Sequence, residues 1–428
     1  MDQMLHIGGS DSAYAKGYAK MRLVECNVFW NSPPNTLTYG DSFYTRLTGC
    51  EKMRTHQMDT KGDIIDSYEY AFSEDNGKTW TALEQRSVYE PLPEGGALGR
   101  IILPGFVDPR NGRLFTVYNE SVLPCDDAME AMTRTILGYT VSLDGGRTNA
   151  LDEMIVQEGY TSENPMRGVT VGKNAVMLGD KGCEPIRTIG GRLLVPVQVC
   201  PVGPDGNYIN PGGGLSYHEA AVLIGRWSDD PADLHITWDL SPYISNDPAK
   251  STRGALEPTI AQFPDGRILM VLRGSNGGTK DPDFRIPGHK WYTISHDEGD
   301  SWEPVRPWTY SDGMPFFSPS SMSQLLKHSN GDYYWIGNIS PTNSRANSPR
   351  YPLVVGRVNP ETLLLERDSV FVVDDRQPGE HEETMLSMIH AHEERGTGDI
   401  LLHMSRWLTR GFSDLTGDAS LYRISTES

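Results

Sequence analysis

The sequence of 428 residues lacks the features that mark membrane proteins, zinc ribbons and nucleic-acid-binding proteins. It has no apolar run of about 18 residues, so neither a membrane span nor a membrane partner is expected. Its five cysteines are widely spaced and form no CxxC pair, so no structural zinc site is indicated. The formal net charge of −19 argues against a nucleic-acid partner, because phosphate binding needs a basic surface.

The N-terminal stretch 1–20 also lacks the apolar core of a signal peptide. Taken as given, the chain is therefore expected to be cytoplasmic, with its cysteines present as buried free thiols. A secreted protein from which the signal peptide had been removed would have the same appearance, so that localisation stays open.

Glycine, proline and aromatic residues are plentiful, which favours many short strands joined by tight turns over long helices. A glycine turn followed by an apolar strand recurs along the chain, with 65 to 79 residues between successive glycines. The five copies begin at Asn111, Gly190, Asp265, Asn330 and Thr397. Each copy predicts a β-hairpin, because its turn needs a residue with positive φ.

A second repeated unit lies between these hairpins. The segments 73–80 (SEDNGKTW), 142–148 (SLDGGRT) and 295–302 (SHDEGDSW) share one pattern, and weaker copies occur at 228–238 and 357–360. In such a turn the aspartate accepts backbone N–H groups, the glycine takes the positive φ, and the tryptophan packs beneath the hairpin. The spacing predicts one such turn in most repeats.

These turns resemble the Asp boxes (BNR repeats) of the sialidase, or neuraminidase, superfamily. The resemblance implies an all-β fold, a six-bladed β-propeller of four-stranded antiparallel blades, with seven blades as the less favoured count. We expect a single domain over 1–428. Residues 1–40 would form an N-terminal segment with a ring-closing strand near 21–30, and 41–428 would form the blades.

Polar side chains recur where the second strand of each predicted blade ends. Because equivalent positions of a propeller converge on its axis, these residues are expected to line a polar central cavity, although solvated strand ends would show the same pattern. The positions are Arg54 and His56, Asn119 and Glu120, Gln198, Arg273, Asn338 and Arg406.

The resemblance also implies a three-arginine cluster that binds a substrate carboxylate. Arg273 matches the second arginine, Glu257 its acidic partner, and Arg350 the third arginine, while Glu184 occupies in blade three the place of Glu257 in blade four. The F-R-I-P run that carries the first arginine is absent, and Arg46 is its substitute. Arginine suits this role because its planar fork pairs bidentately with a carboxylate.

The family's last-blade tyrosine nucleophile is missing from 379–392. His56 and Asp63 occupy the region of blade one where the family places its aspartic acid/base, so His56, Asp63 and Glu257 are the catalytic candidates. Weaker candidates are His218, His381, His390 and His392.

We therefore expect a glycoside hydrolase that releases a terminal acidic sugar, either sialic acid or a uronate-linked residue, from an acidic oligosaccharide. One alternative is a polysaccharide lyase that cleaves a uronate glycan by histidine-assisted β-elimination. Another is a non-catalytic glycan-binding propeller. No cofactor is required and no ligand spacing demands a metal, although a divalent ion stays open. The oligomeric state is not predicted.

Overall fold

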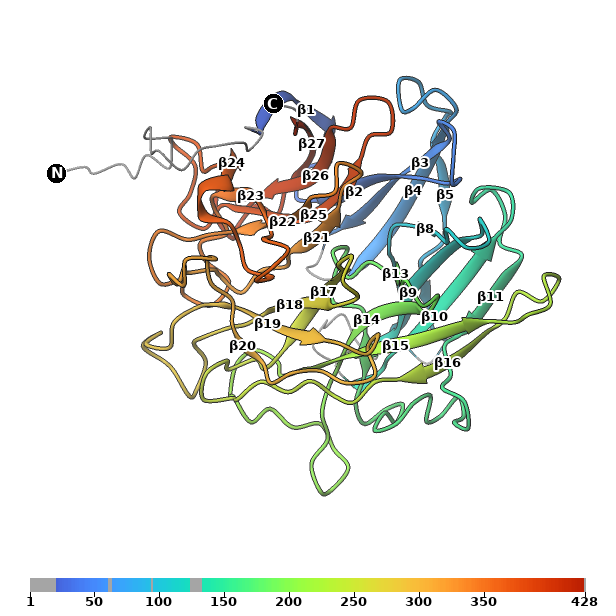
Figure 1. Ribbon diagram of the computed structural model, residues 1–428, viewed down its shortest axis with the longest axis horizontal. Helices are drawn as coiled ribbons and strands as arrows, with labels where there is room; N and C mark the ends of the chain where they lie inside the picture. The colour runs from blue at the N-terminus through green and yellow to red at the C-terminus, as the bar shows by residue number, and fades with distance from the viewer. Residues whose placement is uncertain (1–20, 61–63, 94, 124–132, 427–428) are drawn as a thin grey trace.

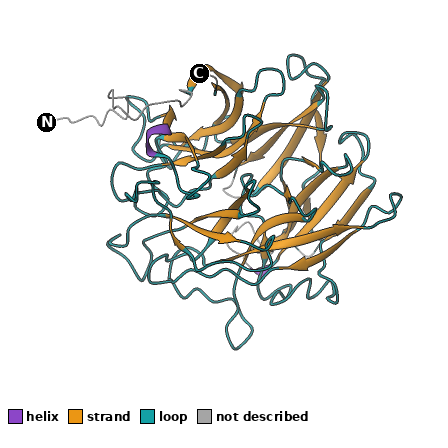
Figure 2. Ribbon diagram, in the orientation of Figure 1, coloured by secondary structure: helices purple, strands orange, loops and turns teal. Residues whose placement is uncertain are grey.

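The computed structural model describes residues 21–60, 64–93, 95–123 and 133–426. Six antiparallel sheets follow one another around a central axis, which confirms the predicted all-β, six-bladed propeller (Figures 1 and 2). The candidate Asp63 lies outside the described residues.

Blades one, four and five have the expected four-stranded arrangement, with the first strand nearest the axis. Blade one consists of β2 (Leu37–Tyr44), β3 (Lys52–Asp59), β4 (Ile65–Ser73) and β5 (Glu84–Arg86). Blade four consists of β17 (Leu256–Gln262), β18 (Ile268–Arg273), β19 (Lys290–Ser295) and β20 (Arg306–Pro307). Blade five consists of β21 (Gln324–Lys327), β22 (Tyr333–Asn338), β23 (Leu353–Arg357) and β24 (Phe371–Asp374).

Blades two and three depart from four strands because their inner strands are broken into pieces that pair with one long neighbour. Blade two contains β6 (Tyr89–Pro91), β7 (Ala97–Ile102), β8 (Phe106–Val107), β9 (Leu114–Leu123), β10 (Thr135–Ser142) and β11 (Leu151–Met154). Blade three contains β12 (Val176–Met177), β13 (Ile186–Arg187), β14 (Leu193–Val199), β15 (Glu219–Trp227) and β16 (Ile236–Leu240). Residues 178–185, between β12 and β13, are not part of the sheet.

Blade six joins the two ends of the described chain. Its strands are β25 (Met385–Glu393), β26 (Ile400–Trp407), β27 (Asp418–Ser425) and β1 (Arg22–Trp30). The N-terminal strand β1 pairs antiparallel with the C-terminal strand β27, so the two lie side by side (Figure 1). The described residues include one short 3-10 helix, η2 (Arg367–Ser369), and no helix among them is long and apolar enough to cross a membrane.

The apolar core lies between neighbouring blades. Phe115 of blade two packs against Trp238 of blade three, and Trp308 packs edge-on against Trp335 of blade five. Because both faces of each sheet are covered by the next blade, the middle strands are almost wholly buried and read as continuous apolar runs rather than alternating ones.

The turns of the second repeat share one hydrogen-bond pattern. The backbone N–H groups of Thr79, Thr148 and Ser301 each donate to the aspartate four residues earlier, at 2.8–2.9 Å. All three turns connect the third and fourth strands of a blade. They therefore lie at the end of the sheets opposite the end of the second strand, because successive strands run antiparallel.

Among the described cysteines, Cys183 and Cys200 are buried but Cys26 and Cys50 are exposed, and none forms a disulfide. The expectation of uniformly buried thiols was therefore wrong, because Cys26 lies on the outer strand β1, which no further strand covers.

Candidate functional site

The loop 179–184, with the sequence GDKGCE, connects blade three to residues of four other blades. Lys181 pairs with Asp41 of blade one at 2.6 Å, and Glu184 contacts both Gln324 of blade five at 3.1 Å and His390 of blade six at 2.8 Å. Gly179 lies directly against Glu257 of blade four. Only a segment on the propeller axis can reach so many blades, so this loop occupies the central channel.

Two of the three proposed carboxylate-binding arginines meet beside this loop. Arg273 ends β18, and its Nε donates to the Ser320 hydroxyl at 2.8 Å. Arg350 precedes β23, and its Nη2 donates to the carbonyl of the same residue at 3.1 Å. Both side chains are largely buried, yet Asn347, which accepts from Arg273 at 3.1 Å, is partly exposed. The structure therefore brings Arg273 and Arg350 together at one spot.

Glu257 forms an ion pair with Arg273 and stands at a break in the register of β17. Its φ of +41° lies in the left-handed region, which is costly for a side chain of this type and is kept only where the surroundings enforce it. Its backbone N–H donates to the Gln198 amide oxygen at 2.8 Å, while its Oε2 is buried and has no hydrogen-bond partner among the described residues. The strain thus turns the carboxylate toward the arginine and the axis.

Asp180 is the titratable group whose properties suit proton transfer. Burial, with a smaller contribution from the charge of Glu257, raises its pKa to about 7, against the opposing effect of Lys181 and Arg350. Asp180 is partly exposed, and the neighbouring Glu184 side chain is 33% exposed, so solvent reaches this end of the channel. An acid with this pKa is protonated to a large fraction near neutral pH.

Further basic side chains lie near the group. Lys290 is buried and donates to the Ser321 carbonyl, and burial together with Arg273 lowers its pKa well below the usual value. Buried His218 lies behind Arg273; burial, Arg253 and Arg273 lower its pKa well below the usual value. His218 contacts Ser216 at 3.0 Å, the hydroxyl that also accepts from Arg253. Because these pKa shifts favour the neutral forms of Lys290 and His218, the positive charges that suit the site to an anionic ligand are those of Arg273 and Arg350.

The amides at the second-strand ends have a structural role. Asn119 exchanges two hydrogen bonds with the backbone of Leu178 in the next blade, and Asn338 donates to the carbonyls of Arg350 and Leu386. Gln198 acts likewise on Glu257, and in blade one Gln57 bridges to Ile102. These amides therefore connect blade one to two, two to three, three to four and five to six, and Gln198 and Asn338 support the arginine site rather than line it.

Glu120 and Arg406 are neutralised away from the axis. Glu120 pairs with Arg100 at 2.7 Å on the side of blade two. Arg406 pairs with Asp374 at 2.6 Å and with Glu380 at 2.7 Å, beside the last strand of blade five. Neither belongs to the group around Ser320.

Arg46 lies at the opposite end of the propeller from Arg273. It follows β2, the first strand of its blade, and donates to the Leu143 carbonyl of an Asp-box-like turn at 2.9 Å. First-to-second and third-to-fourth connections share one end of an antiparallel sheet, whereas Arg273 marks the other end. The structure thus separates Arg46 from the two arginines with which it was grouped.

Arg54 and His56 lie within β3 rather than at its end, which is Asp59. Arg54 stacks over Trp80 at 5.0 Å. His56 is fully buried, stacks on Trp30 with ring centroids 4.1 Å apart, and has no hydrogen-bond partner among the described residues. Burial, with a smaller effect of Arg54, lowers its pKa to about 3, so the ring is neutral and sealed from solvent at neutral pH.

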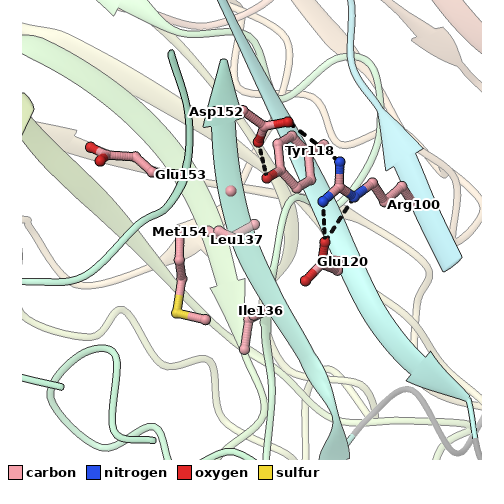
Figure 3. Close-up of a pocket in the computed structure, with 9 residues that line it drawn as sticks. Arg100, Tyr118, Glu120, Ile136, Leu137, Asp152, Glu153 and Met154 are labelled. Carbon is pink, nitrogen blue, oxygen red and sulfur yellow. Dashed lines mark hydrogen bonds and ion pairs between the residues drawn. The ribbon is translucent and has the colours of Figure 1, made fainter. Parts of the chain in front are cut away.

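A separate hollow of about 400 Å³ opens on the side of blade two (Figure 3). Its polar groups bind one another: Arg100 pairs with Glu120 at 2.7 Å, and Tyr118 donates to Asp152 at 2.6 Å (Figure 3). Apart from Glu120, none of the predicted site residues that the structure describes lines it. Because its charges are satisfied internally, we place the candidate site at the axial group of Asp180, Glu257, Arg273 and Arg350.

The sequence reasoning missed Asp180, Lys181 and Ser320. The signal for the first two was available, since a charged pair flanked by glycines (Gly179-Asp180-Lys181-Gly182) precedes Glu184. Ser320 carries no local signal, because its role depends on two arginines from different blades.

The comparisons with known proteins agree with this architecture. No model of a known protein family matches the sequence, and no curated protein matches it. Among solved structures, a protein of unknown function from Dyadobacter fermentans is similar with a TM-score of 0.61 and 14% identity, over 95% of this chain and 99% of that one.

Two sialidases show the same fold. NanB sialidase from Streptococcus pneumoniae is similar with a TM-score of 0.57 and 14% identity, over 95% of this chain and 70% of its own. The leech intramolecular trans-sialidase in complex with 2,7-anhydro-Neu5Ac is similar with a TM-score of 0.56 and 13% identity, over 96% of this chain and 70% of its own. At these identities the likeness shows the fold alone: the chain has a sialidase-like six-bladed β-propeller, strongly diverged in sequence.

Proposed function

We propose that this protein is a carbohydrate-active enzyme, a glycoside hydrolase that releases a terminal acidic sugar. The observation that carries the proposal is the convergence of Arg273 and Arg350 on Ser320, beside an aspartic acid whose pKa is about 7. The sialidase-like fold supports it by analogy, since the similar solved structures include a sialidase and a trans-sialidase.

In this proposal the two guanidinium groups bind the sugar carboxylate, each through paired N–H donors. Glu257 positions Arg273 through their ion pair and does not touch the sugar. Asp180 donates its proton to the glycosidic oxygen as the bond to the anomeric carbon breaks. Water then adds to the anomeric carbon and its proton returns to Asp180, which restores the acid.

Hydrolysis is favoured over β-elimination by the placement of His56. A lyase needs a base that reaches the proton next to the uronate carboxylate, and the histidine expected for this role is buried between Trp30 and Phe29. Asp180, by contrast, lies near Glu257 and Arg350 and is partly exposed.

The test is a hydrolysis assay of the full-length protein on fluorogenic sialosides and glucuronides and on sialyl-lactose. Arg273→Lys or Arg350→Lys should lower kcat/KM by about 100-fold, because each removes one bidentate contact. Asp180→Asn should lower kcat while leaving substrate affinity in place. Arg46→Lys, at the opposite end of the propeller, is the matched control and should change neither kcat nor KM.

Three results would each overturn the proposal. Binding of these sugars without any release of product indicates a glycan-binding propeller. Product that absorbs in the ultraviolet as an unsaturated uronate indicates a lyase. If kcat/KM falls equally in the Arg46 control and in the Arg273 and Arg350 variants, the substrate site is not the axial one.

A further inference from the structure

Three histidines gather on one face of blade six. His390 and His392 are two positions apart on β25 and therefore point to the same side of the sheet, and His403 of β26 stands directly opposite His390. The rings face one another, with centroids 5.9–6.3 Å apart and interplanar angles of 14–29°. None of the three belongs to the arginine site, although His390 touches Glu184.

Each of the three rings uses only one of its nitrogens. Nε2 of His390 contacts Glu184 at 2.8 Å, Nε2 of His392 contacts Lys52 Nζ at 2.8 Å, and Nε2 of His403 contacts the Ser42 hydroxyl at 3.3 Å. Nδ1 of every ring is buried and has no hydrogen-bond partner among the described residues. Three such atoms in one place are unusual, because a buried polar atom without a partner has lost its hydrogen bonds to water without replacing them.

The distances fit a metal ion. One ring nitrogen from each histidine lies within 4.8 Å of the corresponding atoms of the other two. For three atoms so arranged there is always a point no more than about 2.8 Å from any of them, and a zinc–imidazole bond is about 2.0–2.1 Å. Each nitrogen must therefore move by less than about 1 Å, which a small rotation of the ring provides.

We propose that His390, His392 and His403 form a binding site for one divalent late first-row transition metal, with zinc as the expected ion. Imidazole nitrogen is a ligand that zinc, copper and nickel prefer, whereas magnesium and calcium prefer oxygen. We assign Nδ1 as the ligand atom of each ring, because Nε2 already has a partner in all three.

Two neighbours support this assignment. Glu184 accepts the Nε2 proton of His390, the carboxylate–histidine arrangement that orients metal ligands. The second neighbour is Lys52, whose Nζ contacts Nε2 of His392 at 2.8 Å and so occupies the ring nitrogen that is not assigned to the metal.

The site is distinct from the carbohydrate chemistry proposed above and does not depend on it. The ion would give the three Nδ1 atoms the partner that the protein does not supply. All three ligands come from the two innermost strands of blade six, the sheet that contains both ends of the described chain. Binding of the ion is therefore expected to raise the stability of the folded protein.

The experiment uses the full-length protein, stripped with a chelator and then titrated with Zn²⁺ or Co²⁺. We expect one ion per chain by elemental analysis, a visible cobalt spectrum typical of nitrogen ligands, and a higher melting temperature on loading. His392→Gln and His403→Gln should each weaken zinc affinity at least 100-fold and abolish the melting shift. His289→Gln is the matched control, because this half-buried histidine of blade four should retain wild-type binding.

X-ray absorption of the zinc-loaded wild type keeps the proposal testable if a variant fails to fold. The expected spectrum shows three imidazole ligands. Absence of stoichiometric zinc binding, fewer than three imidazoles in the spectrum, or full zinc affinity in both variants would each overturn the site.

Discussion

A β-carbon added to Gly179 would lie 2.5 Å from the Cα of Glu257. Real contacts of this kind essentially never fall below 3.0 Å, so the axial loop and the inner strand of blade four can approach so closely only because residue 179 is glycine. This contact couples the loop that carries Asp180 to the strand that carries Glu257.

Gly179→Ala should therefore displace Glu257 and, through the ion pair, Arg273. We expect a loss of about 1–3 kcal/mol in the free energy of unfolding, the usual cost of overpacking, measured by urea denaturation. Gly99→Ala is the matched control, because its added carbon would meet Leu123 at an ordinary 3.5 Å. Equal stability of the two variants would show that the loop is not held against β17.

Asp180 should give the protein a distinctive dependence of stability on pH. Its pKa is raised to about 7 in the folded protein from the ordinary value of about 4, so the folded state holds a proton that the unfolded state has released. The stabilisation is complete below about pH 4 and is lost as the pH rises through about 7.

Asp180→Asn removes this effect. Relative to the wild type, the variant should gain roughly 1–3 kcal/mol in the free energy of unfolding as the pH increases from 4 to 8. Urea midpoints of both proteins across this range provide the measurement. A difference between the two proteins that does not vary with pH would contradict the raised pKa.

The ion pair of Arg273 and Glu257 should show strong non-additivity. Arg273→Met leaves Glu257 buried without its cation and should cost about 3–5 kcal/mol. Adding Glu257→Gln to that variant should recover much of the loss, because the unpaired charge is gone. As a reference, Arg410→Met removes an exposed pair with Asp414 and should cost no more than about 1 kcal/mol. Additive losses at 273 and 257 would mean that the two groups do not pair.

The amide bridges between blades should contribute to stability. Asn119→Leu leaves the N–H and C=O of Leu178 without their partner and should cost about 1–3 kcal/mol by chemical denaturation. Asn149→Leu, at an exposed position, should stay within about 0.5 kcal/mol of the wild type. If Asn119→Leu leaves the free energy of unfolding unchanged, the recurring polar positions are better explained as the lining of a solvent-filled cavity.

The architecture was predictable because its signals are local. Each Asp-box-like segment forms its turn from its own residues, as the bond from Thr79 to Asp75 shows, and the repeat spacing then gives the number of blades. The pair Glu257 and Arg273 was also visible, because both lie on adjacent strands of one blade, at positions that a short stretch of sequence specifies.

The site was only partly predictable because its remaining members come from different blades. Arg46 was grouped with Arg273 as the substitute for the first arginine of the family motif, and the antiparallel strand order puts it at the other end of the propeller. His56 had the right chemistry for an acid/base, but its position inside β3 places it between aromatic rings. The pair His390 and His392 was noticed, whereas the third ligand, His403, becomes evident only through strand pairing.

The sequence by itself determined the propeller, its six repeats and the arginine–glutamate pair of blade four. Turns and short strands depend on residues that are neighbours in the chain. The tertiary structure alone decided that loop 179–184 fills the axis, that Arg350 joins Arg273 at Ser320, and that three histidines face one another. Those contacts join residues of different blades, which come together only when the six blades close into a propeller. No local sequence pattern specifies which distant segments will then meet.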